Sequence, residues 1–368
     1  MWQRIMALVA KELLAILRDP RGRMVIIVPP VLQLVVFSYA ATLEVKNADI
    51  TILNRDSGKW GHELIQRIDG APAFRNLVQT RSDEVLHDLI VRQDVIAAVQ
   101  IGPAFSRDIE AGHQGDVQII LDGRRSNAAQ IVSGYLGQII SGLARDLATP
   151  RQRAASVDIA PRYWFNPNLT FVWFTVPSLV AIIALLIGLV VTALSVARER
   201  ELGTFDQLMV SPLRTHEILI GKLTPPMMIG MVHITLYVLA AIFLFGVPLR
   251  GSLVLLYGSA VFYLASVVGI GLFISSLSMT QQQAILGAFV FIVPAVLLSG
   301  FATPIENMPE WLQPVTFVNP LRYFLIVAKG VFLKDISASE VVHNTIPLAL
   351  IALGTLTAAA WLFRSRLE

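Results

Sequence analysis

Long apolar stretches alternate along this chain with short polar segments. Six of the stretches reach the roughly 20 residues that an α-helix needs to cross a bilayer. They cover residues 24–43, 171–197, 223–246, 252–277, 284–303 and 346–363. The pattern predicts a polytopic α-helical membrane protein with six transmembrane helices.

The residues before the first apolar stretch form an amphipathic pattern. Apolar residues recur every three or four positions, at Trp2, Ile5, Val9, Leu13 and Ile16. Basic residues recur every seven positions, at Arg4, Lys11 and Arg18. This spacing predicts a helix over residues 1–18 that lies on the membrane surface and is closed by Pro20, within a cytoplasmic segment 1–23. The alternative is a polar tail with chance periodicity.

The first apolar stretch has one competing interpretation. A basic N-terminus, an apolar run and the small-residue sequence Ser38-Tyr39-Ala40 imitate a signal peptide with its cleavage site. The apolar run is too long for an ordinary signal peptide, however, and a long amphipathic segment precedes it. We therefore interpret residues 24–43 as an uncleaved span.

Basic residues gather at particular ends of the predicted spans and indicate their orientation. They are Arg4, Lys11, Arg18, Arg21 and Arg23 before the first span, Arg198, Arg200, Arg214 and Lys222 after the second, and Arg364 and Arg366 at the end. The short loop after the third span has only Arg250. Both termini and the segment after the second span are therefore predicted to be cytoplasmic, and residues 44–170 to lie outside.

The predicted outer segment 44–170 changes character. Strand-like runs cover residues 50–53, 95–101 and 117–121, and helical patterns cover 63–68, 84–91, 104–110 and 128–147. Ser82 or Asp83 is a suitable N-cap for the second of these helices. The segment is expected to fold as an extracytoplasmic α/β domain with a core of its own.

A second outer region, residues 304–345, is neither a plain loop nor a span. Its apolar residues are interrupted by prolines, which favours short re-entrant helices packed at the outer membrane face. The residues that define this pattern are Pro304, Glu306, Asn307, Met308, Pro309, Asn319 and Pro320.

Composition supports the membrane assignment and excludes several other classes. Of the 368 residues, 55% are hydrophobic and 15% charged, whereas a soluble domain carries about 25% charged residues. The net charge of +3 gives no reason to expect a nucleic-acid partner. The absence of cysteine excludes disulfides and thiolate sites.

No catalytic motif is present. Gly58-Lys59 and Gly221-Lys222 lack the preceding glycine and following hydroxyl of a phosphate-binding loop, so the chain is not expected to hydrolyse ATP. The histidines show no metal-ligand spacing, and the pairs Asp206 with His216 and His62 with Glu63 are interpreted as solvated side chains. No catalytic, cofactor-binding or metal-binding residue is predicted, and the chain is not expected to be an enzyme.

Ionisable residues are nearly absent from the predicted spans, where only His233 occurs, in the third. Ion-driven transporters need buried titratable groups to carry the coupling charge. His233 is interpreted as a helix contact or a residue lining a pathway, with a proton site as the alternative. Energy for any transport is expected to come from outside this chain, and an ion-driven secondary transporter is the competing hypothesis.

The polar segment 198–213 between the second and third spans shows how that energy could enter. Gly203 would break a helix, and Leu202, Phe205, Leu208, Met209 and Leu213 supply an apolar side. Glu199, Arg200, Glu201 and Asp206 supply charges that suit a complementary groove. A connector with no partner is the alternative.

Residues 195–213 resemble the signature of the ABC-2 type exporter permeases, the membrane subunits of ATP-binding-cassette transporters. Supporting matches occur in the family's order along nearly the whole chain. They are residues 121–124 with Ser126 and Asn127, residues 164–168, Ser299-Gly300 with residues 304–309, and Asn319-Pro320. The chain is most similar to the bacterial YbhR/YbhS/YhhJ type, which has a large outer domain after the first span.

The resemblance implies a bacterial inner-membrane multidrug exporter whose ATP and Mg are bound by a separate ABC ATPase subunit. A second permease chain, in a homodimer or heterodimer, the lipid bilayer and a periplasmic membrane fusion protein are the other implied partners. Residues 198–218 would hold the coupling helix seated on the ATPase. Its expected contact residues are Arg198, Glu199, Arg200, Glu201, Gly203, Thr204, Asp206 and Gln207.

The second and fifth spans of two permeases are expected to line the pathway for drugs or other amphipathic compounds. His233, Gly287, Ser299 and Gly300 are the candidate residues for lining it or for close helix contact. A membrane-anchored sensor or scaffold with an outer ligand-binding domain is the second alternative, but it leaves the remaining spans without a role.

Overall fold

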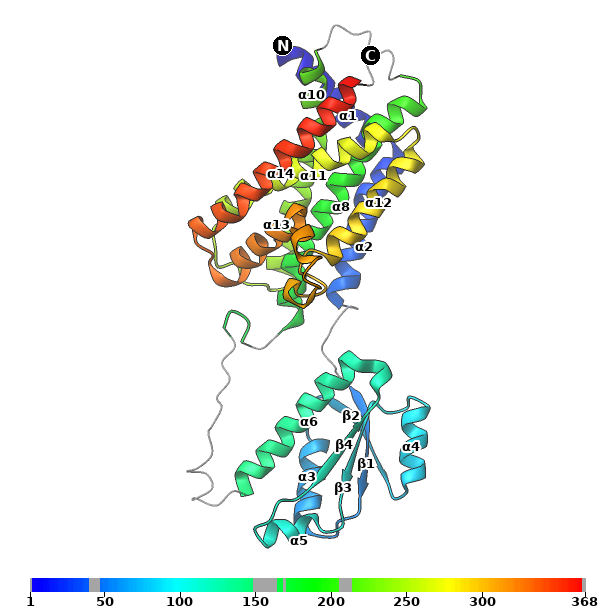
Figure 1. The fold of residues 1–368 in the computed structure, drawn as a ribbon, viewed down its shortest axis with the longest axis vertical. Coiled ribbons are helices and arrows are strands. Elements are labelled where there is room, and N and C mark those ends of the chain that lie inside the picture. The colour runs from blue at the N-terminus through cyan, green and yellow to red at the C-terminus, as the bar shows by residue number, and fades with distance from the viewer. Residues whose placement is uncertain (1, 40–46, 148–163, 168–169, 205–213, 366–368) are drawn as a thin grey trace. The chain divides into compact units, whose positions relative to one another are not determined.

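The computed structural model describes residues 2–39, 47–147, 164–167, 170–204 and 214–365. The chain forms two compact units, one of residues 1–41 with 163–368 and the other of residues 42–162 (Figure 1). The first unit is helical and the second combines helices with a sheet. Each has its own apolar core.

The helical unit contains helices of very different length and polarity. They are α1 (Trp2–Arg18), α2 (Pro20–Tyr39), α8 (Phe171–Glu201), α10 (Thr215–Leu239) with a π-helical turn at Ala240–Leu244, α11 (Leu253–Leu277), α12 (Gln281–Leu297), α13 (Pro320–Lys329) and α14 (Ala338–Ser365). In the described part of the chain, four helical segments are long and apolar enough to cross a membrane: Phe171–Glu201, His216–Leu244, Leu253–Leu277 and Ala338–Leu362. The other two predicted spans fall on shorter apolar helices, Ile26–Ser38 and Gln281–Leu297.

The N-terminal boundary differs from the prediction. Pro20 does not merely close α1 but is the first residue of α2, so the second helix starts before the predicted residue 24. Proline suits this position because its missing N–H has no helical acceptor there and its φ is already helical. The buried face of α1 consists of Ile5, Leu8 and Glu12, whereas Trp2, the first residue of the predicted stripe, is exposed.

Other boundaries also move once the helices are packed. Helix α10 begins well before the predicted residue 223, and α12 ends at Leu297 rather than near 303. Helix α14 begins at Ala338, so the last part of the predicted outer region 304–345 belongs to that helix. The rest of that region forms two 3₁₀ turns, Ile305–Asn307 and Gln313–Val318, then α13 and a π turn at Gly330–Lys334.

Helix α8 runs through the middle of the helical unit (Figure 1). It packs against α2, α10, α11, α12 and α13. Glycines permit the closest of these approaches: a Cβ on Gly271 of α11 would lie 3.1 Å from the Leu189 carbonyl of α8, and one on Gly188 would lie 3.0 Å from Val267. The result is a helix that is buried over nearly its whole length.

The second unit is a four-stranded sheet in the order β2-β1-β3-β4. Strands β1 (Ala48–Asn54), β2 (Phe74–Thr80) and β3 (Ala97–Ile101) are parallel, and β4 (Val117–Leu121) pairs antiparallel with β3. Helices α3 (Lys59–Asp69), α4 (Asp83–Val91), α5 (Phe105–Glu110) and α6 (Ser126–Leu147) connect or follow the strands.

Helices cover the two faces of this sheet unequally. Helices α3 and α6 lie on one side and α4 on the other (Figure 1). Ile50, Ile52 and Val99 pack with α3 and α6, and Leu53 and Ala98 pack with Leu86 and Ile90 of α4. The predicted helices and strands of this segment are confirmed, and the Ser82 hydroxyl accepts the Glu84 N–H as the predicted cap. Strand β2 was missed because its sequence, Phe-Arg-Asn-Leu-Val-Gln-Thr, is mostly polar and exposed.

The segment 121–124 has a structural role in this unit. Asp122 is buried and its carboxylate accepts hydrogen bonds from Arg124 Nε at 2.8 Å and Nη2 at 3.1 Å. The same guanidinium donates to the carbonyls of Ile90 at 2.6 Å and Val91 at 3.2 Å, at the end of α4. Arg124 therefore adds side-chain donors to the carbonyls at the end of α4, where that of Ile90 also accepts the Gln93 N–H.

Candidate functional site

The predicted coupling helix is wrong in its first residues, which belong to α8. Arg198, Glu199, Arg200 and Glu201 are the last residues of α8 rather than the start of a new helix. Gly203, with φ of 70°, ends α8 in a left-handed conformation. The Gly203 N–H donates to the Arg200 carbonyl at 3.1 Å and the Thr204 N–H to the Glu199 carbonyl at 2.9 Å. These two bonds form a Schellman motif, whose left-handed residue is best supplied by glycine.

Glu199 lies inside the protein, which is the second correction. Only 7% of its surface is exposed. Its carboxylate lies 2.7 Å from Lys222 Nζ of α10 and 2.7 Å from Lys11 Nζ of α1. A side chain with these partners has no carboxylate oxygen free for an external protein, so Glu199 joins three helices of its own chain.

Glu12 of α1 completes an ion cluster in which Glu12, Glu199 and Lys222 are buried and Lys11 is exposed. Lys222 Nζ lies 3.1 Å from Glu12 Oε1, and the Ser195 hydroxyl of α8 donates to Glu12 Oε2 at 3.3 Å. Lys222 is 1% exposed and Glu12 7%. Burial of unpaired charges would cost several kcal/mol each, so the helices must meet for the charges to be compensated.

The amphipathic helix α1 is thereby attached to the membrane helices. A Cβ on Gly221 would lie only 2.4 Å from Leu8 Cδ2, so α1 and α10 are in close contact at the residue before Lys222. Burial alone would lower the pKa of Lys11, but the hydrogen bond and charge of Glu199 raise it above its ordinary value. Lys11 is therefore a stable cation at neutral pH.

The other charged residues at the end of α8 also bond within the chain. Arg198 Nη1 lies 3.2 Å from Asp19 Oδ2, between α1 and α2. Arg200 Nη1 donates to the carbonyls of Ser276 at 2.8 Å and Ser278 at 3.1 Å, where α11 ends. Glu201 accepts the Gln281 N–H at 2.8 Å, where α12 begins. The end of α8 is thus bonded to α1, α10, α11 and α12, and to Asp19 between α1 and α2.

Of the remaining predicted contact residues, the structure describes Thr204 but not Asp206 and Gln207. The Thr204 hydroxyl donates to the Glu199 carbonyl at 3.3 Å. Asp206 and Gln207 lie outside the described residues. The chain is described again from Arg214, whose N–H donates to the Glu217 carboxylate at 3.0 Å at the start of α10.

A cavity of about 520 Å³ lies beside the ion cluster, between α1, α8 and α12. Ile16, Leu194 and Ile285 give it apolar walls, and Lys11 and Arg198 lie at its lining. Lys11, Glu12, Ser195 and Lys222 were not among the predicted site residues. One signal in the sequence could have indicated the cluster. Glu12 follows Ile5 and Leu8 at helical spacing, so a charged residue lies on the apolar face of α1 that becomes buried.

His233 is a contact between helices. Its Nε2 atom lies 3.1 Å from the Ile26 carbonyl oxygen of α2, and its Nδ1 atom lies 2.9 Å from the Ile229 carbonyl oxygen of its own helix. The side chain is 8% exposed. Both nitrogens therefore face main-chain oxygens.

The outer motif residues have mainly local roles. The Asn319 side-chain oxygen Oδ1 accepts the Leu321 N–H at 3.1 Å as the N-cap of α13, followed by Pro320 at its first position. The Asn319 amide donates to the Ala295 carbonyl of α12 at 2.7 Å. Pro304 precedes the turn that contains Glu306 and Asn307, and the Met308 carbonyl accepts the Gln313 amide at 3.0 Å.

The small residues assigned to the pathway are placed differently from one another. A Cβ on Gly287 would lie 2.8 Å from Ile274, so this glycine serves contact between α12 and α11 of one chain. Gly300, with φ of 83°, and Ser299, whose hydroxyl donates to the Val296 carbonyl at 2.6 Å, shape the turn after α12. Ser299 and Gly300 thus lie just beyond the end of α12 at Leu297.

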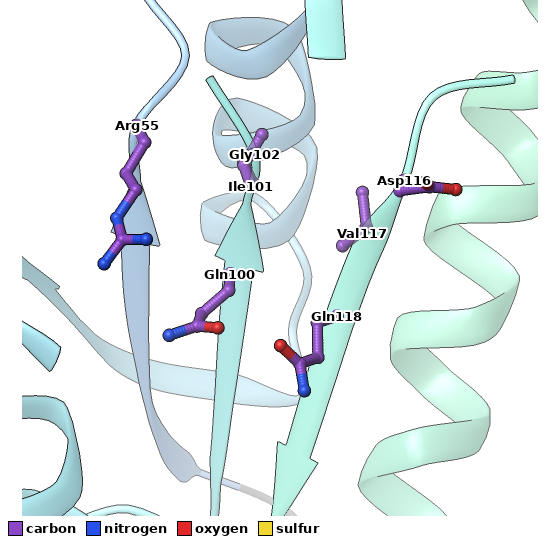
Figure 2. A pocket seen from close by; sticks show the side chains of 7 residues that line it. All are labelled: Arg55, Gln100, Ile101, Gly102, Asp116, Val117 and Gln118. Atoms are coloured by element: carbon purple, nitrogen blue, oxygen red, sulfur yellow. The ribbon is translucent and has the colours of Figure 1, made fainter. Parts of the chain in front are cut away.

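The α/β unit has a polar hollow of about 450 Å³ at the ends of β1 and β3 and the start of β4. Arg55, Gln100, Asp116 and Gln118 line it (Figure 2). Arg55 and Gln100 both bond to Asp83 at the start of α4, with 2.8 Å from Gln100 Nε2 to Asp83 Oδ1. These contacts pair Arg55 and Gln100 within the unit. Among the described residues, no group of three or more histidine, aspartate or glutamate side chains could hold a metal ion.

The comparisons with known proteins decide the family. Residues 22–361 match the family model described as ABC-2 family transporter protein. The chain belongs to the ABC-2 transporter family. It is 43% identical over 366 residues to the "Probable multidrug ABC transporter permease YbhR" of Escherichia coli strain K12, covering 100% of both chains.

Two further relatives from the same strain extend the similarity. The chain is 33% identical to the "Probable multidrug ABC transporter permease YbhS", over 90% of this chain and 89% of the relative. It is 28% identical to the "Inner membrane transport permease YhhJ", over 82% of this chain and 84% of the relative. This ABC-2 protein is a membrane permease subunit and not itself an enzyme.

Proposed function

We propose that this permease exports amphipathic compounds, drugs among them, across a bacterial inner membrane. The names of two similar proteins as multidrug permeases support this substrate class. In the proposed topology, α2 and α12 complete six spans with the four long helices, both termini are cytoplasmic, and residues 44–170 lie outside. The basic residues around α1 and the end of α8 favour that orientation.

Coupling to ATP hydrolysis is proposed to enter at the end of α8. The observation that carries this proposal is the bonding of the last turn of α8, Arg198–Glu201, to four neighbouring helices and to Asp19 between α1 and α2. A displacement of that turn by a bound ATPase would be transmitted to α1, α10, α11 and α12 together, because these helices are bonded to it and packed closely. Residues 205–213, which follow Gly203, would provide the surface that touches the ATPase.

The remaining partners follow from this role. ATP and Mg would be bound by the separate ATPase and not by this chain. A second permease, identical or related, would complete the pathway along α8 and α12. A membrane fusion protein is the proposed partner of the outer unit.

Replacement of Gly203 tests the coupling proposal. Gly203→Val forces a β-branched residue into a left-handed conformation, at a cost of about 1–2 kcal/mol or more, whereas asparagine tolerates it. No atom lies within 4 Å of a Cβ at this position, so the two variants differ in backbone preference rather than in packing. We expect an ATPase to co-purify with the wild-type chain and with Gly203→Asn.

Export should then separate the variants. Gly203→Val should still be inserted in the membrane but should lose ATP-dependent export, while Gly203→Asn should retain most of it. Equal export by the two variants would refute the role of this turn. A wild-type chain that purifies without any nucleotide-binding subunit would refute the ABC assignment of the energy source.

A further inference from the structure

Two aromatic rings and a lysine converge at the end of α8 opposite Glu201. Phe174 lies in the first turn of α8, Phe301 follows α12, and Lys329 is the last residue of α13. The two rings stack almost parallel, with centroids 5.9 Å apart and an interplanar angle of 8°. Lys329 Nζ lies 3.9 Å from the Phe174 centroid and 5.9 Å from the Phe301 centroid. The ammonium group therefore contacts the π face of one ring and lies beside the other.

Lys329 has no anionic partner in the described part of the chain, where neither a hydrogen bond nor an ion pair of its ammonium group is found. Burial lowers the pKa of Lys329 to about 8. A cation that loses hydration without gaining a carboxylate is stabilised mainly by the ring quadrupoles. Such an ammonium group is held weakly.

Arg322, on the same helix α13, provides a contrast. Its guanidinium lies 4.5 Å from the Phe317 centroid, but it also donates a hydrogen bond to the Thr316 hydroxyl. That hydrogen bond fixes its position, so the contact with Phe317 is a structural one. Lys329 lacks such an anchor, and its flexible four-carbon stem permits the ammonium to leave the ring.

The ring pair remains accessible. Phe174 keeps 37% of its surface exposed, and Phe301 and Lys329 are half-buried. Removal of the ammonium would leave the face of Phe174 open beside Phe301. Stacked aromatic faces without hydrogen-bond donors favour a cation with an apolar body over a neutral or anionic molecule.

We propose that Phe174 and Phe301 form a recognition site for organic cations, which Lys329 occupies when no cargo is bound. An arriving lipophilic cation displaces the ammonium group of Lys329 and takes its place on the rings. The inference rests on the proposed export function and specifies its substrate class. It assigns Lys329 as an internal competitor of the cargo.

Binding of two ions of the same shape and opposite charge tests the proposal. The complex of the full chain with its ATPase, purified in mild detergent, would be titrated by equilibrium dialysis with tetraphenylphosphonium and, separately, tetraphenylborate. Lys329→Met should tighten tetraphenylphosphonium binding about tenfold, the scale of one desolvated cation–π contact. The same change should weaken tetraphenylborate binding, because a nearby positive charge is lost.

Three further variants control this result. Lys329→Arg keeps a cation over the rings and should bind tetraphenylphosphonium as the wild type does. Phe174→Leu should weaken binding of that cation severalfold, in the wild type and in the Lys329→Met background. Lys59→Met removes a surface lysine that lies 4.7 Å from the Trp60 ring of the other unit, so it changes the net charge equally and should have no effect.

Unchanged tetraphenylphosphonium binding in both Lys329→Met and Phe174→Leu would overturn the proposal. The proposal would also be overturned if Lys59→Met tightened tetraphenylphosphonium binding as much as Lys329→Met does. The loss of one positive charge anywhere in the protein would then explain the gain. If Lys329→Met does not assemble, the Phe174→Leu titration alone decides. Failure of the export function is separate, since the wild-type chain would then purify without an ATPase, and the same titrations of that chain alone would still test the cation site.

Discussion

The Nε2 atom of His233 lies 3.1 Å from the main-chain oxygen of Ile26, four residues before Pro30. In a regular helix, the N–H of residue 30 would donate to that oxygen, but proline has no N–H. His233 of α10 therefore approaches a carbonyl that α2 cannot satisfy by itself. Within a membrane such carbonyls need a partner from a neighbouring helix.

Removal of this partner should destabilise the contact of α2 with α10. His233→Ala is expected to cost about 1–3 kcal/mol of unfolding free energy, the usual cost of an unsatisfied buried acceptor. Pro30→Ala in the same chain restores an N–H beside Ile26 and should recover part of the loss. Thermal unfolding of the single and double variants in detergent would measure the coupling, and identical losses with and without Pro30 would contradict it.

Neutralisation of Lys222 should disrupt the assembly of the helical unit. Lys222→Met leaves Glu12 and Glu199 buried with only Lys11, and it is expected to cost about 3–5 kcal/mol. Lys222→Met with Glu199→Gln removes one charge of each sign and should restore part of the stability. Lys11→Met should cost less, because 53% of the Lys11 side chain is exposed. The yield of folded protein and its unfolding temperature rank the three variants by stability. A larger loss of stability for Lys11→Met than for Lys222→Met would contradict this prediction.

Two glycines of α11 give a matched test of helix packing. A Cβ on Gly271 would lie 2.7 Å from Thr192 Cβ and 3.1 Å from the Leu189 carbonyl oxygen, whereas a Cβ on Gly258 would have no neighbour within 4 Å. Gly271→Ala should therefore destabilise the protein by about 1–3 kcal/mol through overpacking. Gly258→Ala should be neutral or stabilising by up to about 1 kcal/mol. Equal unfolding temperatures for the two variants would show that α8 and α11 do not approach as closely as described.

Arg124 is expected to stabilise the end of α4. Arg124→Lys keeps the charge but loses the planar donors that reach Asp122, Ile90 and Val91 together. Hydrogen exchange of the full chain should become faster over residues 88–94, while exchange in α3 on the opposite face of the sheet should stay the same. Faster exchange over the whole unit would instead indicate a global role for Arg124.

The same contact predicts a dependence on pH. The side-chain hydrogen bonds from Arg124 hold the pKa of Asp122 below its ordinary value of 3.8. Because the folded pKa is the lower one, this stabilisation is present in full above about pH 4 and is lost as the pH falls through the folded value. Asp122→Asn should remove this part of the acid sensitivity of exchange over residues 88–94. An unchanged acid profile in that variant would exclude Asp122 as the titrating group.

The sequence by itself determined the family, the positions of most helices and the α/β character of the second unit. Those properties depend on hydrophobic periodicity and on local motifs, which are legible along the chain. The Ser82 cap and the Asn319-Pro320 start of α13 are examples, since each involves residues within a few positions of one another.

Only the tertiary structure decided the roles of the charged residues. Glu12 and Lys222 are 210 residues apart in the chain, and nothing in the local sequence indicates that they share one ion cluster with Lys11 and Glu199. From the sequence, Glu199 is expected to contact the ATPase, together with the other charges of residues 198–207. Packing of α1 against α8 and α10 reversed that expectation, because each of these charges has its compensation on another helix.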